Sequence, residues 1–238
     1  MRYATKWIEL TYDGSFRNPL FDLVRNPVDV IEAIHKRLST KYHVPLTDMS
    51  TCSGSKLSDF HARIVLFSGN GTIDVRADGF NAKFINARSE QDSEAVKDCL
   101  LMTSEALSEL NASEVAYGRE TVSLRMFAEL LDEPFDGPIF LRSLFANSAL
   151  FENESAQESH EIVPGFQVEF LNESQKWMCS FNVSRAHRSR KELFVLINAN
   201  YDEGNPFPTM DQKASHLRTL LEIALVRAQL QPTDPTGE

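Results

Sequence analysis

The alternation of hydrophobic and polar residues predicts a strand and then a helix at the start of the chain. Residues 5–12 (TKWIELTY) place Ile8, Leu10 and Tyr12 on one side of an extended segment. After a loop, residues 26–43 carry hydrophobic residues at helical spacing, with a proline at the first helical position, where a missing N–H costs nothing. We therefore expect a strand followed by an amphipathic helix.

Residues 59–88 are predicted to form three antiparallel strands, because two turn signals divide them. The first signal is Asn70-Gly71, a pair typical of tight hairpins, in which both turn positions favour a positive φ. The second signal is the DGF segment at 78–80. A long helix follows at 89–110, with acidic residues in its first turn, as the helix dipole favours.

The second half of the chain repeats this order of patterns. We predict a strand, a short helix, three strands and a final long helix at 120–131, 136–147, 165–172, 176–184, 192–201 and 209–230. The polar residues 231–238 are expected to be a disordered tail.

The order of elements favours an α+β fold with antiparallel sheets covered by helices. One interpretation is a duplicated unit of strand, helix, three strands and helix, with halves at 1–112 and 113–230. The alternative is that residues 6–128 form a ferredoxin-like unit with an extra strand. Both interpretations place the helices on one face of the sheet.

Three segments resemble a sporadically distributed, mostly uncharacterised bacterial family whose halves look like the SecB chaperone fold. The family's central strand reads Gly-Leu-Arg-Tyr-Ile-Asn; here Leu124 and Arg125 match, but Met126 replaces the Tyr and Ala128 the Asn. In FVLINANY, asparagines stand where the family alternates aspartates, and the closing helix lacks the family's aromatic residue. The resemblance implies an interaction protein, with a chaperone-like role or a place in a bacterial defence or toxin–antitoxin system, and implies no chemistry.

The overall composition disfavours a dedicated nucleic-acid-binding protein. Lys and Arg number 24 against 34 for Asp and Glu, which gives a net charge of -10, whereas phosphate neutralisation normally demands a basic face. No apolar run is long enough to span a membrane, and no secretory signal is evident. The three scattered cysteines do not form a disulfide framework, so we expect a reducing, cytoplasmic environment.

One short segment, 184–192 (SRAHRSRKE), concentrates positive charge between two predicted strands. Its basic residues and histidine are Arg185, His187, Arg188, Arg190 and Lys191. Arginines in a loop can bind phosphate or an acidic protein, yet the loop lacks the aromatic residues that stack on bases. We expect a solvated hairpin tip; docking of an acidic protein and binding of nucleic acid are the alternatives.

The final helix is hydrophobic over more than half of its circumference, so it is either buried in the core or shared with a partner chain. The candidate interface residues are Leu217, Leu220, Leu221 and Leu225. We expect a homodimer or a complex with another protein.

No motif for chemistry is present. The histidines lack zinc-helix spacing, no Cys-x-x-Cys occurs, and no glycine-rich loop opens a helix. The acidic segment with Glu152, Glu154, Glu158 and Glu161 is expected to be a linker. We therefore expect neither catalysis nor a metal or cofactor, and predict a non-catalytic protein-binding module. The alternative is a nucleic-acid-linked regulator or immunity factor acting through 184–192, and an enzyme with an unrecognised site is a third hypothesis.

Overall fold

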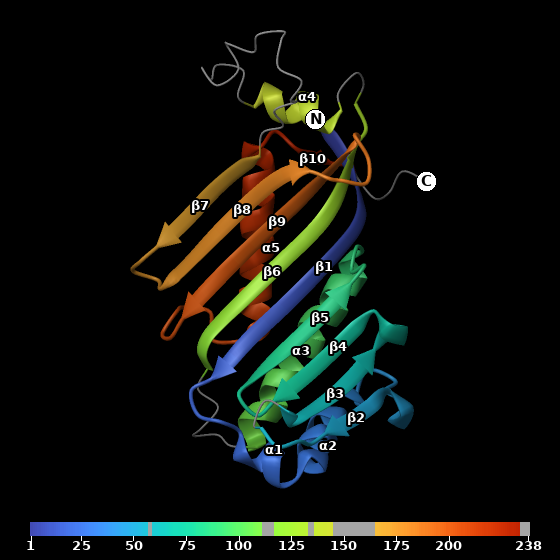
Figure 1. Ribbon diagram of the computed structural model, residues 1–238, viewed down its shortest axis with the longest axis vertical. Helices are drawn as coiled ribbons and strands as arrows, with labels where there is room; N and C mark the ends of the chain where they lie inside the picture. Colours follow the sequence, from blue (N-terminus) through green and yellow to red (C-terminus); the bar gives the residue numbers. More distant parts are fainter. Residues whose placement is uncertain (57–58, 111–116, 133–135, 145–164, 234–238) are drawn as a thin grey trace.

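A ten-stranded sheet forms the centre of the described part of the protein (Figure 1). The computed structural model describes residues 1–56, 59–110, 117–132, 136–144 and 165–233. The strands are β1 (Arg2–Phe16), β2 (Met49–Cys52), β3 (His61–Leu66), β4 (Gly71–Arg76), β5 (Gly79–Ile85), β6 (Tyr117–Leu130), β7 (Phe166–Asn172), β8 (Trp177–Arg185), β9 (Glu192–Asp202) and β10 (Gln231–Pro232).

The strand order is β2-β3-β4-β5-β1-β6-β9-β8-β7, with β10 joined to β1 off this path. The long strands β1 and β6 lie side by side at the centre and pair antiparallel from Tyr3↔Leu130 to Phe16↔Tyr117. The first half of the chain supplies the strands on one side of this central pair, and the second half supplies those on the other side. The sheet therefore continues across the expected boundary at 112/113, which itself lies outside the described residues.

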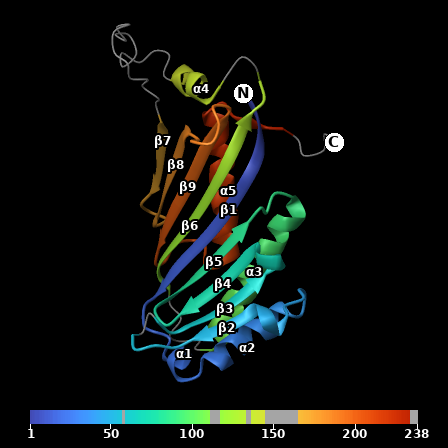
Figure 2. The ribbon, with the colours of Figure 1, turned by 45° about the vertical axis from the view of Figure 1, so that its right-hand side comes forward.

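The main helices cover one face of this sheet (Figure 2). The helices are α1 (Phe21–Arg25), α2 (Pro27–Leu38), α3 (Glu90–Leu110), α4 (Gly137–Ser143) and α5 (Met210–Arg227). Helix α2 packs on α3, α3 packs on α5, and α5 contacts β6 and β9, while α4 lies near one end of the sheet beside β8. The opposite face of the sheet carries no described helix. None of the described helices is long and apolar enough to cross a membrane.

Strand β9 illustrates why the sheet has one covered face. Its alternate residues Leu193, Val195 and Ile197 are fully buried against the helices, whereas the residues between them are only half-buried. Burying one face of each strand removes apolar area from water, while the other face keeps polar side chains in contact with solvent. The structure thus confirms the predicted α+β class and the three antiparallel strands within residues 59–88.

The turn between β3 and β4 differs from the expected tight hairpin. Positive φ angles occur at Phe67, Ser68 and Gly69, in a short 3₁₀ segment, whereas Asn70 has a φ of -80°. Gly71 already pairs with Leu66 and Phe84 within the sheet, and a Cβ atom there would lie 3.0 Å from the Phe67 ring. A Cβ atom at this position would therefore force a neighbouring side chain to shift, and the prediction of a positive φ at both Asn70 and Gly71 was wrong.

Two short strands were not predicted. Residues 49–52 were expected in a loop but form the edge strand β2, whose mostly exposed side chains give no hydrophobic alternation. The expected disordered tail begins instead with β10, where the Gln231 N–H donates to the Met1 carbonyl and the Thr233 N–H to the Tyr3 carbonyl. Strand β5 reaches β1 only from Glu9 onward, so the start of β1 has an open edge that β10 fills. Residues 234–238 lie outside the described residues.

Candidate binding surface

Three aromatic side chains form a continuous row on the helix-free face of the sheet. Trp7 of β1 is opposite Phe127 of β6, and Phe127 is opposite Phe194 of β9. The ring centroids are 5.5 Å apart in each pair, at interplanar angles of 43° and 49°. All three side chains are half-buried, because each shields its neighbours while no helix covers them. We call these residues the aromatic row.

We call the basic segment 184–192 the basic loop. Arg188 of this loop lies over the Phe127 ring of the aromatic row. Its guanidinium carbon is 5.1 Å from the centroid of the Phe127 ring, within the distance at which a cation is attracted to an aromatic face. The basic segment and the aromatic row therefore belong to one surface, which the aromatic-free loop sequence did not indicate.

Backbone hydrogen bonds fix the loop between β8 and β9 to neighbouring elements. The carbonyl oxygen of Arg190 accepts from the Gly137 N–H at 2.6 Å, and that of Lys191 accepts from the Leu130 N–H at 2.8 Å. Ala186, in the middle of the basic segment, is buried at 2% exposure and donates its N–H to the Glu192 carbonyl. The loop is thus held against the start of α4 and the end of β6.

Arg188 and Arg190 are exposed, as predicted for a hairpin tip, and each also contacts a neighbouring side chain of the chain. The Nε atom of Arg190 is 2.9 Å from a carboxylate oxygen of Asp136. Asp136 also accepts from the Ile139 N–H at the start of α4, and this bond together with Arg190 lowers the pKa of its carboxyl group. His187 and Lys191 are exposed, and Arg185 is half-buried.

Ion pairs surround the aromatic row on the same face. Lys6 lies 2.5 Å from Glu129, and Glu9 lies 2.6 Å from Lys83 and 3.6 Å from Arg125. Glu9 is only 5% exposed although no helix covers it, because these neighbouring side chains enclose it. The surface around the row therefore has charges of both signs.

The asparagines of β9 lie farther along the same face. Asn200 accepts a hydrogen bond from the Thr121 hydroxyl at 2.9 Å, and Asn198 accepts one from the Ser123 hydroxyl at 3.0 Å. Both side-chain carbonyl groups therefore accept hydrogen bonds from β6. These residues form a strip of neutral polar groups on the helix-free face.

The four candidate interface leucines on α5 lie in the chain's own core. Their exposed fractions are between 0% and 7%, because this side of α5 packs on the sheet and on α3. The named interface on Leu217, Leu220, Leu221 and Leu225 is therefore wrong. The exposed apolar side chains of the helix are Ile223 and Val226, and the expectation of a homodimer or protein partner stays a prediction.

Sequence reasoning missed a buried polar cluster on the covered face. Lys213 of α5 forms an ion pair with Glu120 of β6, and the Tyr12 hydroxyl donates to the same carboxylate. Nearby, the Tyr201 hydroxyl lies 2.9 Å from Nδ1 of His216, whose ring stacks on Phe207 with centroids 4.1 Å apart. Each of these polar groups has a partner, and the cluster joins α5 to the centre of the sheet.

The histidine, cysteine and acidic side chains of the described residues form no metal site. No set of three His, Cys, Asp or Glu side chains there could hold a metal ion. Burial raises the pKa of the Cys99 and Cys179 thiols to about 12, whereas Cys52 is exposed. The acidic segment with Glu152, Glu154, Glu158 and Glu161 lies outside the described residues.

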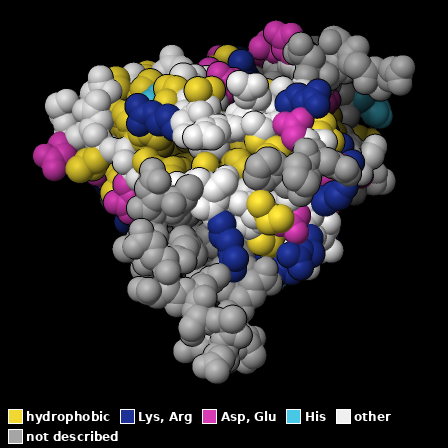
Figure 3. All heavy atoms as spheres, turned by 90° about the horizontal axis from the view of Figure 1, so that it is seen from above, with side chains coloured by type: hydrophobic (Ala, Val, Ile, Leu, Met, Phe, Trp, Pro, Cys, Tyr) yellow, Lys and Arg dark blue, Asp and Glu magenta, His cyan; other side chains and the backbone are white. Residues whose placement is uncertain are grey.

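The charge distribution is mixed at the end of the molecule that carries α4 and the β8–β9 loop. Figure 3 looks onto this end and shows Lys and Arg side chains in separate groups among hydrophobic and acidic ones. The Lys and Arg side chains of the described residues that are visible in this view do not form one continuous patch.

Comparisons with known proteins do not place the chain in a family. No family model matches it, and no curated protein matches it. A solved structure of Methanococcus jannaschii TBP aligns over 92% of this chain and 97% of its own length, at 10% identity and a TM-score of 0.27. A TM-score that low carries no argument about fold or function.

Proposed function

We propose that the protein is a non-catalytic binding module that uses the aromatic row and the basic loop to bind an acidic segment of another protein. The observation that carries the proposal is the position of Arg188 over Phe127, because it joins a cluster of positive charge to an apolar surface. An acidic segment with hydrophobic side chains complements both features.

The residue types on this surface support a protein partner. Trp, Phe and Arg are enriched at the centres of protein–protein interfaces, where large rigid side chains lose little entropy on binding. The ion pairs around Trp7, Phe127 and Phe194 resemble the polar rim of such interfaces. Contact with a partner would bury the parts of the three rings that stay in water.

Charge favours an acidic segment that is short. The basic loop gathers four Lys and Arg residues on a chain whose net charge is -10, so it offers a short anion a local attraction that the chain as a whole does not. Charges act over about 8 Å at physiological ionic strength, and a short segment can stay within that range of the loop. An extended anion would also meet the acidic remainder of the surface.

Single-stranded nucleic acid is the second candidate, and a specific observation favours it. Aromatic side chains on an open sheet beside arginines are the arrangement on which some RNA-binding domains stack bases. Against it, Arg188 already covers Phe127, Arg190 is paired with Asp136, and the net charge opposes a long phosphate backbone.

Trp7 provides the experiment that separates these functions. The chain has two tryptophans, so a Trp177→Phe background leaves the fluorescence of Trp7 as a reporter of the aromatic row. The probes are the peptide Glu-Glu-Phe-Glu-Glu-Leu-Glu-Glu-Phe, its analogue with Lys in place of every Glu, and a twenty-nucleotide oligothymidine. We expect the acidic peptide to shift Trp7 emission with a Kd below about 100 μM, and Arg188→Ala to weaken binding several-fold.

The controls decide among the outcomes. Arg227→Ala removes an exposed arginine on α5, whose guanidinium lies 5.5 Å from the Phe170 ring, and should leave binding unchanged. Tighter binding of the oligonucleotide than of the peptide would establish the second candidate. Equal binding of the acidic and basic peptides would refute the acidic partner, and no binding of any probe would refute both candidates.

We also infer that the two halves arose by duplication of a SecB-like unit. Outward from the central pair, β1-β5-β4-β3 and β6-β9-β8-β7 run in the same order, with a helix after the first and last strand of each half. Each set is a four-stranded antiparallel sheet covered by helices on one face, which is the arrangement that the SecB-like resemblance implies. Superposition of the two halves tests this inference. If β1 cannot be placed on β6 and β5 on β9 by one and the same rotation, the inference is contradicted.

A further inference from the structure

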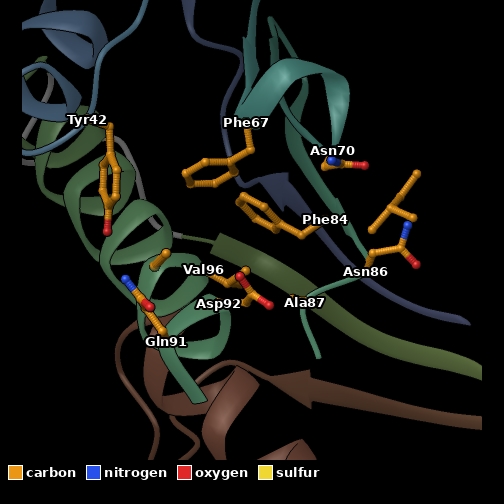
Figure 4. A pocket seen from close by; sticks show the side chains of 11 residues that line it. Tyr42, Phe67, Asn70, Phe84, Asn86, Ala87, Gln91, Asp92 and Val96 are labelled. Atoms are coloured by element: carbon orange, nitrogen blue, oxygen red, sulfur yellow. The ribbon is translucent and has the colours of Figure 1, made fainter. Parts of the chain in front are cut away.

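A separate pocket opens between the start of α3, the end of β5 and the β3–β4 turn (Figure 4). Its volume is about 420 Å³, within the range of small-molecule sites. It shares no lining residue with the aromatic row or the basic loop, so it is independent of the surface described above.

Aromatic rings form the walls of this pocket. Figure 4 shows the rings of Tyr42, Phe67 and Phe84 following one another along the pocket. The centroids of Tyr42 and Phe67 are 5.5 Å apart in an edge-to-face arrangement, and those of Phe67 and Phe84 are 6.4 Å apart. Phe67 is 38% exposed, so part of an aromatic wall stays open to solvent.

The polar lining groups are mainly amides, and two of them, Asn70 and Gln91, are exposed at the mouth of the pocket. The side chains of Asn70 and Gln91 make no hydrogen bond to any group in the described part of the chain. Asn86 accepts from Arg88, and one oxygen of Asp92 accepts from the Arg88 and Ser89 N–H groups. A planar ligand could therefore exchange donor and acceptor hydrogen bonds along its edge.

The backbone around the pocket is strained. Phe67, Ser68 and Asn86 have φ angles of 53°, 54° and 61°, in the left-handed region that side chains with a Cβ disfavour. A positive φ is a genuine outlier for a bulky residue such as Phe67, and such strain concentrates at ligand sites. Asparagine adopts this region readily, so the strain lies at Phe67 and Ser68, of which Phe67 lines the cavity.

We propose that this pocket binds an uncharged aromatic heterocycle with hydrogen-bonding edges, the chemistry of a nucleobase. The ring would pack on the Phe67 and Tyr42 walls, and its edge would meet the amides of Asn70 and Gln91. A phosphorylated ligand is disfavoured, because none of the described lining residues is Lys or Arg and the carboxylate of Asp92 is among them.

Saturation-transfer NMR with adenosine, guanosine, cytidine and uridine tests the proposal on the full chain. We expect at least one nucleoside to bind with a Kd below about 1 mM, and its 5′-monophosphate to bind more weakly. The double variant Asn70→Ala/Gln91→Ala should weaken binding about ten-fold or more, because the ligand edge would lose its amide partners.

The matched control is Gln212→Ala, which removes an exposed amide from the first turn of α5. It should bind like the unmodified protein, and thermal unfolding of every variant shows whether the fold is retained. Absence of binding by all four nucleosides, equal binding in the double variant, or tighter binding of the monophosphate would each overturn the proposal. None of these outcomes depends on the acidic-peptide experiment.

Discussion

The ammonium group of Lys213 lies 2.7 Å from a carboxylate oxygen of Glu120, and these residues are 1% and 4% exposed. The Tyr12 hydroxyl donates to the second carboxylate oxygen. Two charges removed from water are tolerated only when each is paired, so this contact fixes how the start of α5 sits on β6.

Breaking this pair on one side should be strongly destabilising. Lys213→Met leaves the Glu120 carboxylate buried without its cation, and we expect a loss of about 3–5 kcal/mol in the free energy of unfolding. Urea denaturation measures it. The double variant Lys213→Met/Glu120→Gln removes both charges and should recover most of the loss; a double variant no more stable than the single one would contradict the electrostatic explanation.

Relief of the strain in the β3–β4 turn should stabilise the protein. Ser68 is exposed and has a φ of 54°, so Ser68→Gly removes a Cβ from an unfavourable conformation. We expect a gain of about 0.5 kcal/mol, since the strain of about 1–2 kcal/mol is offset in part by the greater entropy of glycine in the unfolded chain. Ser108→Gly, at an exposed position within α3, is the control and should instead destabilise. Equal losses in both variants would contradict strain at Ser68.

Acid should destabilise the protein through His216. Burial lowers the pKa of this imidazole, which lies against Trp177, Tyr201 and Phe207. The unfolded state then binds a proton more readily than the folded state, so this contribution to stability falls as the pH drops through the ordinary histidine pKa near 6.5.

Melting temperatures at pH 5.5 and 7.5 measure this effect. His216→Gln should reduce the difference between the two melting temperatures, whereas His187→Gln, at an exposed position on the basic loop, should leave it unchanged. An equal pH response in the two variants would show that His216 is not responsible.

The two sides of α5 should respond differently to truncation. Leu217 is fully buried, so Leu217→Ala should cost about 2–5 kcal/mol of stability by opening a cavity. Val226 is 70% exposed, and Val226→Ala should change stability by less than about 0.5 kcal/mol. Chemical denaturation of the isolated variants at low concentration makes the comparison. A large loss for Val226→Ala that grows with protein concentration would show that this side of α5 is covered by a second chain.

Local patterns were sufficient for most elements of this fold. Alternating residues predicted β1, β6 and β9, and helical spacing predicted α2, α3 and α5, because a strand or helix with one buried face must repeat hydrophobic residues with its own period. The short strands β2 and β10 were not predictable in this way. They are held by backbone hydrogen bonds to β3 and β1, and a backbone group carries no sequence signal.

The candidate sites depended on contacts that the sequence alone does not record. The basic loop was recognisable from its arginines, but its aromatic surface consists of Trp7, Phe127 and Phe194, from three strands brought together by the register of the sheet. The hydrophobic character of α5 was equally clear, yet only its packing showed that Leu217 is buried while Val226 is exposed. Sequence determined which segments are extended or helical, since that depends on neighbouring residues; tertiary structure decided which faces meet, because strand order and register depend on the whole chain.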